Sequence, residues 1–561
     1  MIGRLPTVVL VCVLGGAAAA DAAVLRVTTT NSEGAGSLRQ AILDSNATPE
    51  ADTIEFAIPG TGPHLIRPLG QWLPAIKGPA VIRGRALANG DPAVVLDGSG
   101  LVAPRTPDQC PGATVTYNAQ TLQWETTRIM GTGPNVRGYF GAGLAVHDSR
   151  DVDISGLEVR NFCVGIAVVR SSNVSIHDVK IVDSHGAAGV IFTGDDGEAG
   201  STALAFNNRL TNSVLLDNGD GFEFTRGARD SVLEGNRIAL TRLLPVDGNA
   251  VEFATAGDHN SVIGNTFTGY ASTAMTVGSG SRHVIRGNRI TANTGPGVTL
   301  GGTDTQVVDN TITNNGGTAL SISGSGHQVV ANVVSGNRGV GIQITGERIA
   351  VSKNAIAGNA GLPIDLAPLG ANVHDGAATC ADGLPDCDTG ANGSQNAPIV
   401  DARSTWTSQG LVIQGALESR ANGMFTIEIF ASRVAASGLS SAPQASRGRG
   451  VAGGEAPGGA RGGAGAAAPG AGGPARGGRG GRGAVEPGTA TASATPTGEG
   501  EHYLGSVTVK TDSAGKGEFT LAVAASDPFG QGGTSLFVAG TATDSSGNTS
   551  ELGPSRAVVR Q

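Results

Sequence analysis

Two short segments of this 561-residue chain each place a glutamate between two apolar residues. The first, DNGDGFEFTRG, carries Glu223, and the second, VDGNAVEFATAG, carries Glu252. In a strand whose apolar residues alternate, the residue between them points away from the core. If these two strands are neighbours, their carboxylates repel each other. A metal ion, a nearby arginine or a shared proton is then expected to compensate the charge.

The two glutamates belong to a repeating unit. Short strands that begin with a small residue recur at intervals of 22 to 32 residues, and asparagines recur in two further registers. A unit of this size cannot bury its own apolar face and must stack on copies of itself. Asparagine at a turn suits such a stack, because each amide can bond to the next. The sequence therefore predicts an all-β protein built on a right-handed parallel β-helix of about nine clear rungs. The strands begin at Gly143, Gly165, Gly189, Gly221, Ala250, Ala274, Gly297, Ala319 and Gly341, and the asparagines are Asn236, Asn265, Asn288, Asn310, Asn332 and Asn354, with Asn293, Asn315, Asn337 and Asn359.

In this stack Glu223 and Glu252 would lie ~4.8 Å apart on adjacent rungs. The unit that begins at Gly189 carries an insertion, TGDDGEAGST, and the next unit carries another, ALTRLLPVDG. We predict that the two insertions wall a cleft with the glutamates on its floor. The candidate catalytic residues are Glu223, Glu252, Arg226 and Asp196, and the candidate substrate-binding residues are Asp195, Asp220, Asp258, His259, Trp124 and Tyr139.

Paired carboxylates can act as general acid and base, or as acid and nucleophile. Arg226 suits a clamp for a uronate better than a base, because guanidinium does not lose its proton in proteins. Trp124 and Tyr139 lie in an insertion and would either stack on sugars or fold that insertion onto the β-helix. The alternative without catalysis is a solvated ion network on a structural or binding solenoid. Three histidines at turns are expected at the surface, namely His147, His177 and His185.

The segment TTTNSEGAGSLRQAILDSNATPEADTIEFAIPG, residues 28–60, resembles the N-terminal region of a bacterial family of secreted β-helix proteins. GLPIDL at 361–366, DTGANGSQNAPIV at 388–400 and a C-terminal run of alternating strands are further marks of that family. The resemblance implies a capping helix at 36–42, which covers the open apolar end of a solenoid. It implies an architecture and says little about activity.

The predicted architecture is also similar to that of pectate lyases, polygalacturonases and related polysaccharide enzymes. This similarity implies that Ca²⁺ could be held by Glu223, Glu252, Asp195 and Asp196, since calcium takes carboxylate oxygens. The Gly-Asp-Asp run at 194–196 is similar to a polygalacturonase motif. No Asn-Thr-Asp precedes it and no Gly-His-Gly follows, so polygalacturonase activity is not carried over.

We therefore expect an exported protein that engages extracellular or cell-wall polysaccharide through the acidic strand face. It would be a calcium-assisted lyase or a glycosidase if it is catalytic. The alternatives are a cell-surface or adhesion protein without catalysis, a calcium site without catalysis, and a purely structural solenoid.

Composition and the N-terminus agree with export. The first 22 residues have a basic start, an apolar run and small residues, which is typical of a signal peptide. No segment is apolar for long enough to span a bilayer. A net charge of -9 argues against nucleic acid as a partner. A secreted, periplasmic or surface-bound monomer is expected.

Four cysteines remain after the predicted cleavage, and an even number in an exported chain favours disulfides. Cys380 and Cys387 would close a small loop, and Cys110 and Cys163 would tie an insertion to the β-helix. Asp386 and Asp388 lie in an acidic linker, where an Asp-x-Asp-x-Gly spacing suits calcium but falls short of an EF-hand.

Past residue 398 the apolar pattern changes to a period of two, which predicts an immunoglobulin-like β-sandwich. A Gly/Ala/Arg-rich stretch that interrupts it has almost no apolar bulk and is expected to be disordered. The predicted organisation is a signal peptide at 1–22, cap and first rungs at 23–100, an insertion at 101–141, β-helix repeats at 142–366, a linker at 367–397, a sandwich at 398–432 and 499–561, and a disordered loop at 433–498.

Overall fold

The computed structural model describes residues 22–101, 114–118, 123–128, 141–186, 188–194, 204–242, 248–372, 386–433, 499–524, 527–530 and 533–561. For 114–118 and 123–128 it describes the backbone alone. These two segments form an antiparallel hairpin, β6 (Thr114–Asn118) and β7 (Gln123–Arg128), within the insertion at 101–141. Among the described residues, no helix has the length and apolarity that a bilayer crossing requires.

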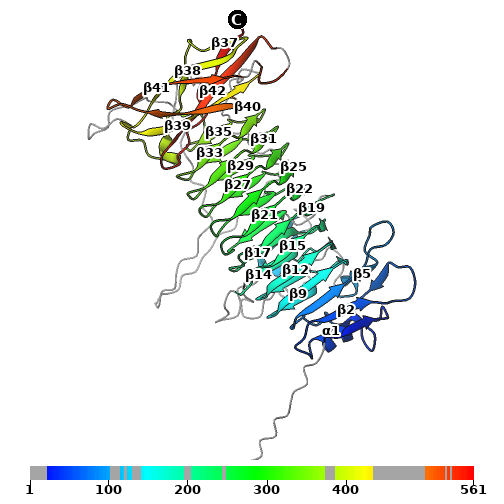
Figure 1. Cartoon of the computed structure of the whole chain (residues 1–561). Helices are drawn as coiled ribbons and strands as arrows, with labels where there is room; N and C mark the ends of the chain where they lie inside the picture. The colour runs from blue at the N-terminus through cyan, green and yellow to red at the C-terminus, as the bar shows by residue number, and fades with distance from the viewer. Residues whose placement is uncertain are drawn as a thin grey trace, which may run out of the picture.

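Three long parallel sheets form the body of the molecule, which is a right-handed parallel β-helix as predicted (Figure 1). Each turn of the chain contributes one strand to each sheet, so consecutive turns stack as rungs. We call the sheets A, B and C. Sheet A contains β1 (Val24–Val27), β2 (Asp52–Phe56), β4 (Ala80–Arg83), β9 (Arg150–Ser155), β12 (Ser172–His177), β15 (Arg209–Thr211), β18 (Val232–Glu234), β21 (Ser261–Ile263), β24 (Val284–Arg286), β27 (Gln306–Val308), β30 (Gln328–Val330) and β33 (Ala350–Ser352). Sheet B contains β3 (His64–Ile66), β5 (Val94–Asp97), β10 (Glu158–Arg160), β13 (Lys180–Val182), β16 (Val214–Leu216), β19 (Arg237–Ala239), β22 (Thr266–Thr268), β25 (Arg289–Thr291), β28 (Thr311–Thr313), β31 (Val333–Ser335) and β34 (Ala355–Ala357). Sheet C contains β8 (Ala142–His147), β11 (Val164–Val169), β14 (Ala188–Thr193), β17 (Asp220–Thr225), β20 (Val251–Ala254), β23 (Met275–Val277), β26 (Val298–Leu300), β29 (Leu320–Ile322), β32 (Ile342–Ile344) and β35 (Ile364–Leu366).

The asparagines of the first register form a continuous ladder inside the corner between sheets A and B. At Asn310 the side-chain oxygen accepts from both the backbone and the side-chain nitrogen of Asn288, each at 2.9 Å. Its own two nitrogens donate in the same way to Asn332, and its side chain also donates to the Ile285 carbonyl. The second register, Asn293 to Asn359, forms a similar ladder inside the corner between sheets B and C. The ladders satisfy buried backbone groups that a turn leaves without a sheet partner.

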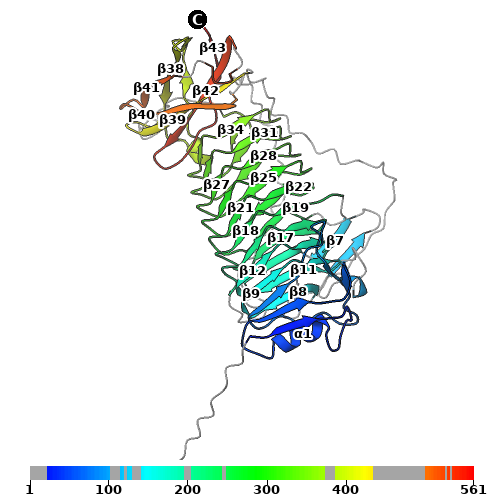
Figure 2. The same ribbon diagram turned by 45° about the vertical axis from the view of Figure 1, so that its right-hand side comes forward.

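A short helix covers one end of the column. Helix α1 (Leu38–Ser45) begins after Ser37, whose hydroxyl accepts from the Gln40 N–H at 3.2 Å and so caps it. Leu38 and Ile42 are buried in the core of the β-helix. Figure 2 shows α1 across the end of the column where the chain begins. A helix near 36–42 was expected, and its apolar face closes the solenoid.

A β-sandwich covers the other end (Figures 1 and 2). It has its own core, which includes the fully buried Trp406. The sandwich is confirmed, and its immunoglobulin-like type stays a prediction. One sheet contains β36 (Ile399–Val400), β37 (Thr405–Thr407), β38 (Gly410–Glu418) and β41 (Lys516–Val523), and the other β39 (Met424–Ser432), β40 (His502–Lys510), β42 (Ser535–Asp544) and β43 (Arg556–Val559). The described residues also contain two 3-10 turns, η1 (Gly98–Gly100) and η4 (Ala391–Ser394).

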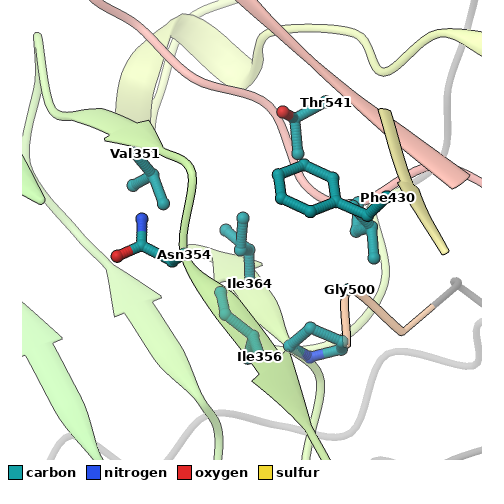
Figure 3. A pocket seen from close by; sticks show the side chains of 9 residues that line it. Val351, Asn354, Ile356, Ile364, Phe430, Gly500 and Thr541 are labelled. Atoms are coloured by element: carbon teal, nitrogen blue, oxygen red, sulfur yellow. The ribbon is translucent and has the colours of Figure 1, made fainter. Parts of the chain in front are cut away.

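The sandwich supplies hydrogen-bond acceptors for the last rungs of the β-helix. The Arg348 and Val351 N–H groups donate to side chains of the segment that follows β42, at 2.8 and 2.9 Å. The Lys353 N–H donates to Glu428 of β39 at 2.8 Å, and Leu366 to Glu551 at 3.1 Å. Figure 3 shows Phe430 and Thr541 of the sandwich across a small gap from side chains of the last rungs. A further strand would normally accept from these amides, so the sandwich acts as a cap.

The two cysteines among the described residues, Cys163 and Cys387, are disulfide-bonded. Their expected partners, Cys110 and Cys380, lie outside the described residues. The pairing therefore stays a prediction.

Replacing Asn310 by alanine should lower the free energy of unfolding by about 3 kcal/mol, because two buried nitrogens of Asn288 lose their acceptor. Urea unfolding followed by circular dichroism measures the change. Gln306→Ala, an exposed outward position on β27, serves as the control. Equal stability of the two variants would show that the ladder contributes little.

Glu551 should make the stability of the contact between the β-sandwich and the last rungs depend on pH. Burial raises its pKa to about 7, against the N–H groups of Leu366 and Asn372, which lower it. The folded state then binds a proton that the unfolded state has lost, so stability is greatest below about pH 4.5 and falls as the pH rises through about 7. We expect Glu551→Gln to match the wild type near pH 4.5 and to exceed it by up to about 3 kcal/mol above pH 7. Thermal unfolding across this pH range measures the difference, and parallel curves for the two proteins would contradict it.

Candidate functional site

Glu223 and Glu252 lie side by side on the outer face of sheet C. Strands β17 and β20 pair in parallel with Glu223 opposite Glu252 and Phe224 opposite Phe253. The phenylalanines point into the core, where their rings lie 4.8 Å apart. The repeat therefore places the two carboxyl groups as neighbours, as its spacing predicts.

Asp220, at the first position of β17, joins the two glutamates. One carboxylate oxygen from each of the three residues lies within 4.8 Å of the others. Asp220 also accepts from the Asn249 N–H of the next rung at 2.6 Å. The side-chain oxygen of Asn249 is buried beside this contact and has no hydrogen-bond partner. Among the described residues, this is the only acidic or metal-ligating cluster of at least three members.

The central carboxyl group is the most desolvated. Glu223 is 6% exposed, and burial raises its pKa well above the usual value. The charges of Asp220 and Glu252 and a hydrogen bond with Asp220 raise the pKa further, while Arg226 lowers it. Burial also raises the pKa of Glu252. Burial and the neighbouring carboxylates therefore favour the protonated form of Glu223, and the charge of Arg226 opposes this shift.

Arg226 follows β17 at the corner between sheets C and A. Its backbone is left-handed, with φ of 50°, and its N–H donates to the Thr255 hydroxyl at 3.1 Å. Its guanidinium acts on the charge of Glu223. This position suits an arginine that stabilises an anion at the cluster.

The outer face of sheet C changes character at the cluster. On the rungs before it the outward residues Ala167 and Ile191 are at most 2% exposed and belong to a separate apolar cluster. On the rungs after it the outward residues are Thr276, Thr299 and Ser321, which solvent reaches. The carboxyl groups therefore lie where a buried apolar surface meets an open polar one, which accounts for the desolvation of Glu223.

Two further buried groups lie at the corner between sheets B and C, and Tyr270 is the one whose pKa responds to Asp220. The Tyr270 hydroxyl is fully buried without a hydrogen-bond partner, and burial and the charges of Asp220 and Asp217 raise its pKa. His185 is 3% exposed, its Nε2 lies 3.3 Å from Asp183, and its Nδ1 has no partner. The expectation that His185 lies at the surface is wrong. The corner that holds it has three residues between Ser184 and Ala188, where the next rung has one, and this extra length was the available signal.

Several expected site residues lie elsewhere. Asp258 and His259 are at the corner between sheets C and A, where Asp258 binds Arg282 at 2.9 Å and His259 lies 3.5 Å from Asp230. Asp386 is buried and accepts from the Ser419 hydroxyl at 2.6 Å, so it ties the linker to the sandwich. Neither Asp386 nor Asp388 belongs to an acidic group of three in the described parts of the chain. Asp195, Asp196 and Tyr139 fall outside the described residues, and only the backbone is described at Trp124.

A known protein family matches the part of the chain that contains Asp220, Glu223 and Glu252. Residues 125–321 match the family model described as NosD, periplasmic copper-binding protein. The chain is a right-handed parallel β-helix protein. A 3-dehydroshikimate dehydratase from Acinetobacter baylyi is 34% identical over 238 residues, which are 42% of this chain and 46% of that protein. The chain thus matches about half the length of this curated relative.

Solved structures with a similar backbone fold were also found. The A-module of the Azotobacter vinelandii mannuronan C-5 epimerase AlgE6 has 14% identity and a TM-score of 0.36, covering 59% of this chain and 96% of its own. The Dettilon tailspike protein has 10% identity and a TM-score of 0.40, with 72% and 78% covered. An alginate lyase from Paenibacillus has 15% identity and a TM-score of 0.29, with 60% and 97% covered.

Single substitutions should move the pKa of Glu223 in opposite directions. Glu252→Gln removes a neighbouring negative charge and should lower it, whereas Arg226→Gln removes a positive charge and should raise it. The carboxylic C=O stretch in infrared spectra, titrated against pH, measures both shifts. A lower pKa in Arg226→Gln would show that the guanidinium does not act on this group.

Proposed function

We propose that Asp220, Glu223 and Glu252 form an acid–base site for a polyhydroxylated, carbohydrate-like substrate outside the cytoplasm. The observation that carries this proposal is the buried carboxyl group of Glu223, whose pKa is raised, beside two other carboxyl groups. Groups with strongly shifted pKa values and a specific charged partner are characteristic of functional sites. A purely solvated ion network would leave Glu223 exposed and ionised.

Proton transfer is the chemistry that this geometry supports. Glu223, whose pKa is raised well above its usual value, is suited to donate a proton to a departing oxygen. Glu252 is more exposed and can accept a proton. In an elimination, the base takes a proton from carbon, the C–H electrons form the C=C bond, and the departing oxygen leaves with the proton from Glu223. Arg226 is suited to hold an anionic group of the substrate.

A polysaccharide is the first candidate substrate. The polar outward residues of β23, β26 and β29 continue from the cluster along the axis of the column. Each rung adds ~4.8 Å, so an extended chain could lie across several rungs. The departing oxygen would then be a glycosidic oxygen, in a lyase or a hydrolase.

A small hydroxylated acid is the second candidate, favoured by the similarity to a 3-dehydroshikimate dehydratase. Loss of water is the same elimination with hydroxide as the departing group. A small substrate would need the corner at Tyr270 and His185 in addition to the carboxyl groups.

Calcium is the proposed cofactor if a cation compensates the negative charge of the cluster. Asp220, Glu223, Glu252 and the unpartnered oxygen of Asn249 offer the hard oxygen ligands that calcium prefers. Bound there, calcium would neutralise a substrate carboxylate. The all-oxygen donor set does not fit copper, which is bound by imidazole and sulfur ligands.

Export to the periplasm or beyond is part of the proposal. It rests on the signal-peptide pattern at 1–22 and on the periplasmic description of the family that residues 125–321 match. A monomer that contacts glycan is the expected form.

Glu223→Gln should reduce turnover by at least about 100-fold, because it removes the transferable proton while keeping size and hydrogen bonding. Pectate, alginate and 3-dehydroshikimate are the substrates to test, with unsaturated or dehydrated products followed by ultraviolet absorbance and mass spectrometry. Glu55→Gln on β2 of sheet A, a glutamate outside the cluster, is the matched control.

The same assay separates the alternatives. Turnover that requires calcium and is lost in both Glu223→Gln and Asp220→Asn would assign the cation. Full activity in Glu223→Gln, or no turnover of any of these substrates by the wild type, would overturn the acid–base proposal in favour of a binding or structural role.

A further inference from the structure

A groove runs along the corner where sheets A and B meet, on the side of the column away from sheet C. Its volume is about 530 Å³, within the range of ligand sites. Thr211, Glu234 and Ile263 of β15, β18 and β21 line it on the sheet A side. Gly235 and Gly264 form part of its floor.

The groove is hollow because three of four successive turns have glycine and so no side chain to fill the corner. Asn212, Gly235, Gly264 and Gly287 occupy the same turn position on four rungs, all with left-handed backbone. Glycine and asparagine adopt this conformation at little cost. Three glycines in a row remove the side chains that would otherwise fill the corner, so the hollow is built by the repeat.

Arg209 lines the groove, and three further arginines lie on strands that flank the same row of turns. Arg237 and Arg289 project from sheet B two rungs apart, about 10 Å by the rung spacing, and Arg286 projects from sheet A across Gly287. All three are exposed, and no ion pair involves them among the described residues. Arg209 lies 3.7 Å from Glu234. Asp178 holds the turn before Asn212 and Asp309 the turn after Gly287, so four arginines accompany three acids along this corner, on a protein whose net charge is -9.

We propose that this arginine-rimmed groove binds a polyanionic glycan, with the carboxylates of a polyuronate chain on Arg237, Arg286 and Arg289. Guanidinium binds planar carboxylates through two parallel hydrogen bonds, which favours arginine over lysine for this role. Ser175, Thr211 and Asn212 offer hydrogen bonds to sugar hydroxyl groups. The groove has no aromatic lining residue on which a nucleic-acid base could stack, so a glycan is favoured over single-stranded nucleic acid.

The groove would hold the polymer on a different face from the carboxyl cluster. The two sites carry opposite charge and lie on different sides of the column. The proposal therefore does not depend on whether the cluster is catalytic. A polyuronate bound in the groove would keep the protein attached to that polymer.

Binding of oligogalacturonate, measured by isothermal titration calorimetry, tests the groove. Glu223→Gln is the background, so that turnover cannot consume the probe. Replacing Arg237, Arg286 and Arg289 together by glutamine should weaken binding at least about tenfold and reduce its salt dependence. The matched control changes three exposed arginines elsewhere to glutamine, namely Arg26, Arg85 and Arg338, and should leave affinity within about twofold.

A second variant changes shape without changing charge. Gly264→Asn places a side chain on the groove floor, where a β-carbon meets nothing within 4 Å, and Asn212 already shows that asparagine fits this turn. It should also weaken binding. Unchanged affinity in the arginine triple variant, absence of binding in the parent, or equal binding of a single-stranded DNA oligonucleotide would overturn the proposal.

Discussion

The in-register stacking of rungs is the constraint on which the molecule depends. Parallel pairing sets each residue directly against its counterpart on the next turn of the chain, as Glu223 and Glu252 show. The asparagine ladders hold this register inside two corners, because each amide bonds to the one on the next rung. A one-residue slip would turn every outward side chain inward. The charge and polarity of the β-helix surface are therefore set by rows of side chains at equivalent positions on successive rungs, and not by single residues.

That constraint also concentrates charge. Two acids at the same repeat position cannot separate, so burial and like charge raise the pKa of Glu223, and the guanidinium of Arg226 opposes the shift. On the opposite side the same rule lines up arginines and removes side chains at three successive turns. The acidic face is partly buried and suited to proton transfer, whereas the basic groove is open and suited to holding a charged chain. The two faces thus differ in solvation as much as in sign.

Much of this architecture could be predicted from spacing alone. Periods near 22 residues and the aligned asparagines predict the β-helix, and they place Glu223 beside Glu252. Spacing could not predict that Asp220 turns toward both glutamates, because the direction of a side chain at a strand end depends on the corner. Nor could it predict the burial of Glu223, which follows from the apolar outer surface on the preceding rungs. Asp258 and His259 follow Glu252 closely in sequence, yet the corner carries them to other partners.

The sandwich occupies amides that would otherwise be free at the end of the column. Glu428, Asn548, Thr549 and Glu551 accept from backbone N–H groups of the last rungs, in the places that another strand would take. At the opposite end, α1 packs its apolar side chains onto the core. A solenoid could extend by stacking further rungs or other molecules on its ends. In this protein α1 and the β-sandwich cover the two ends. The column therefore has a defined length and is protected from fusing end to end into fibres.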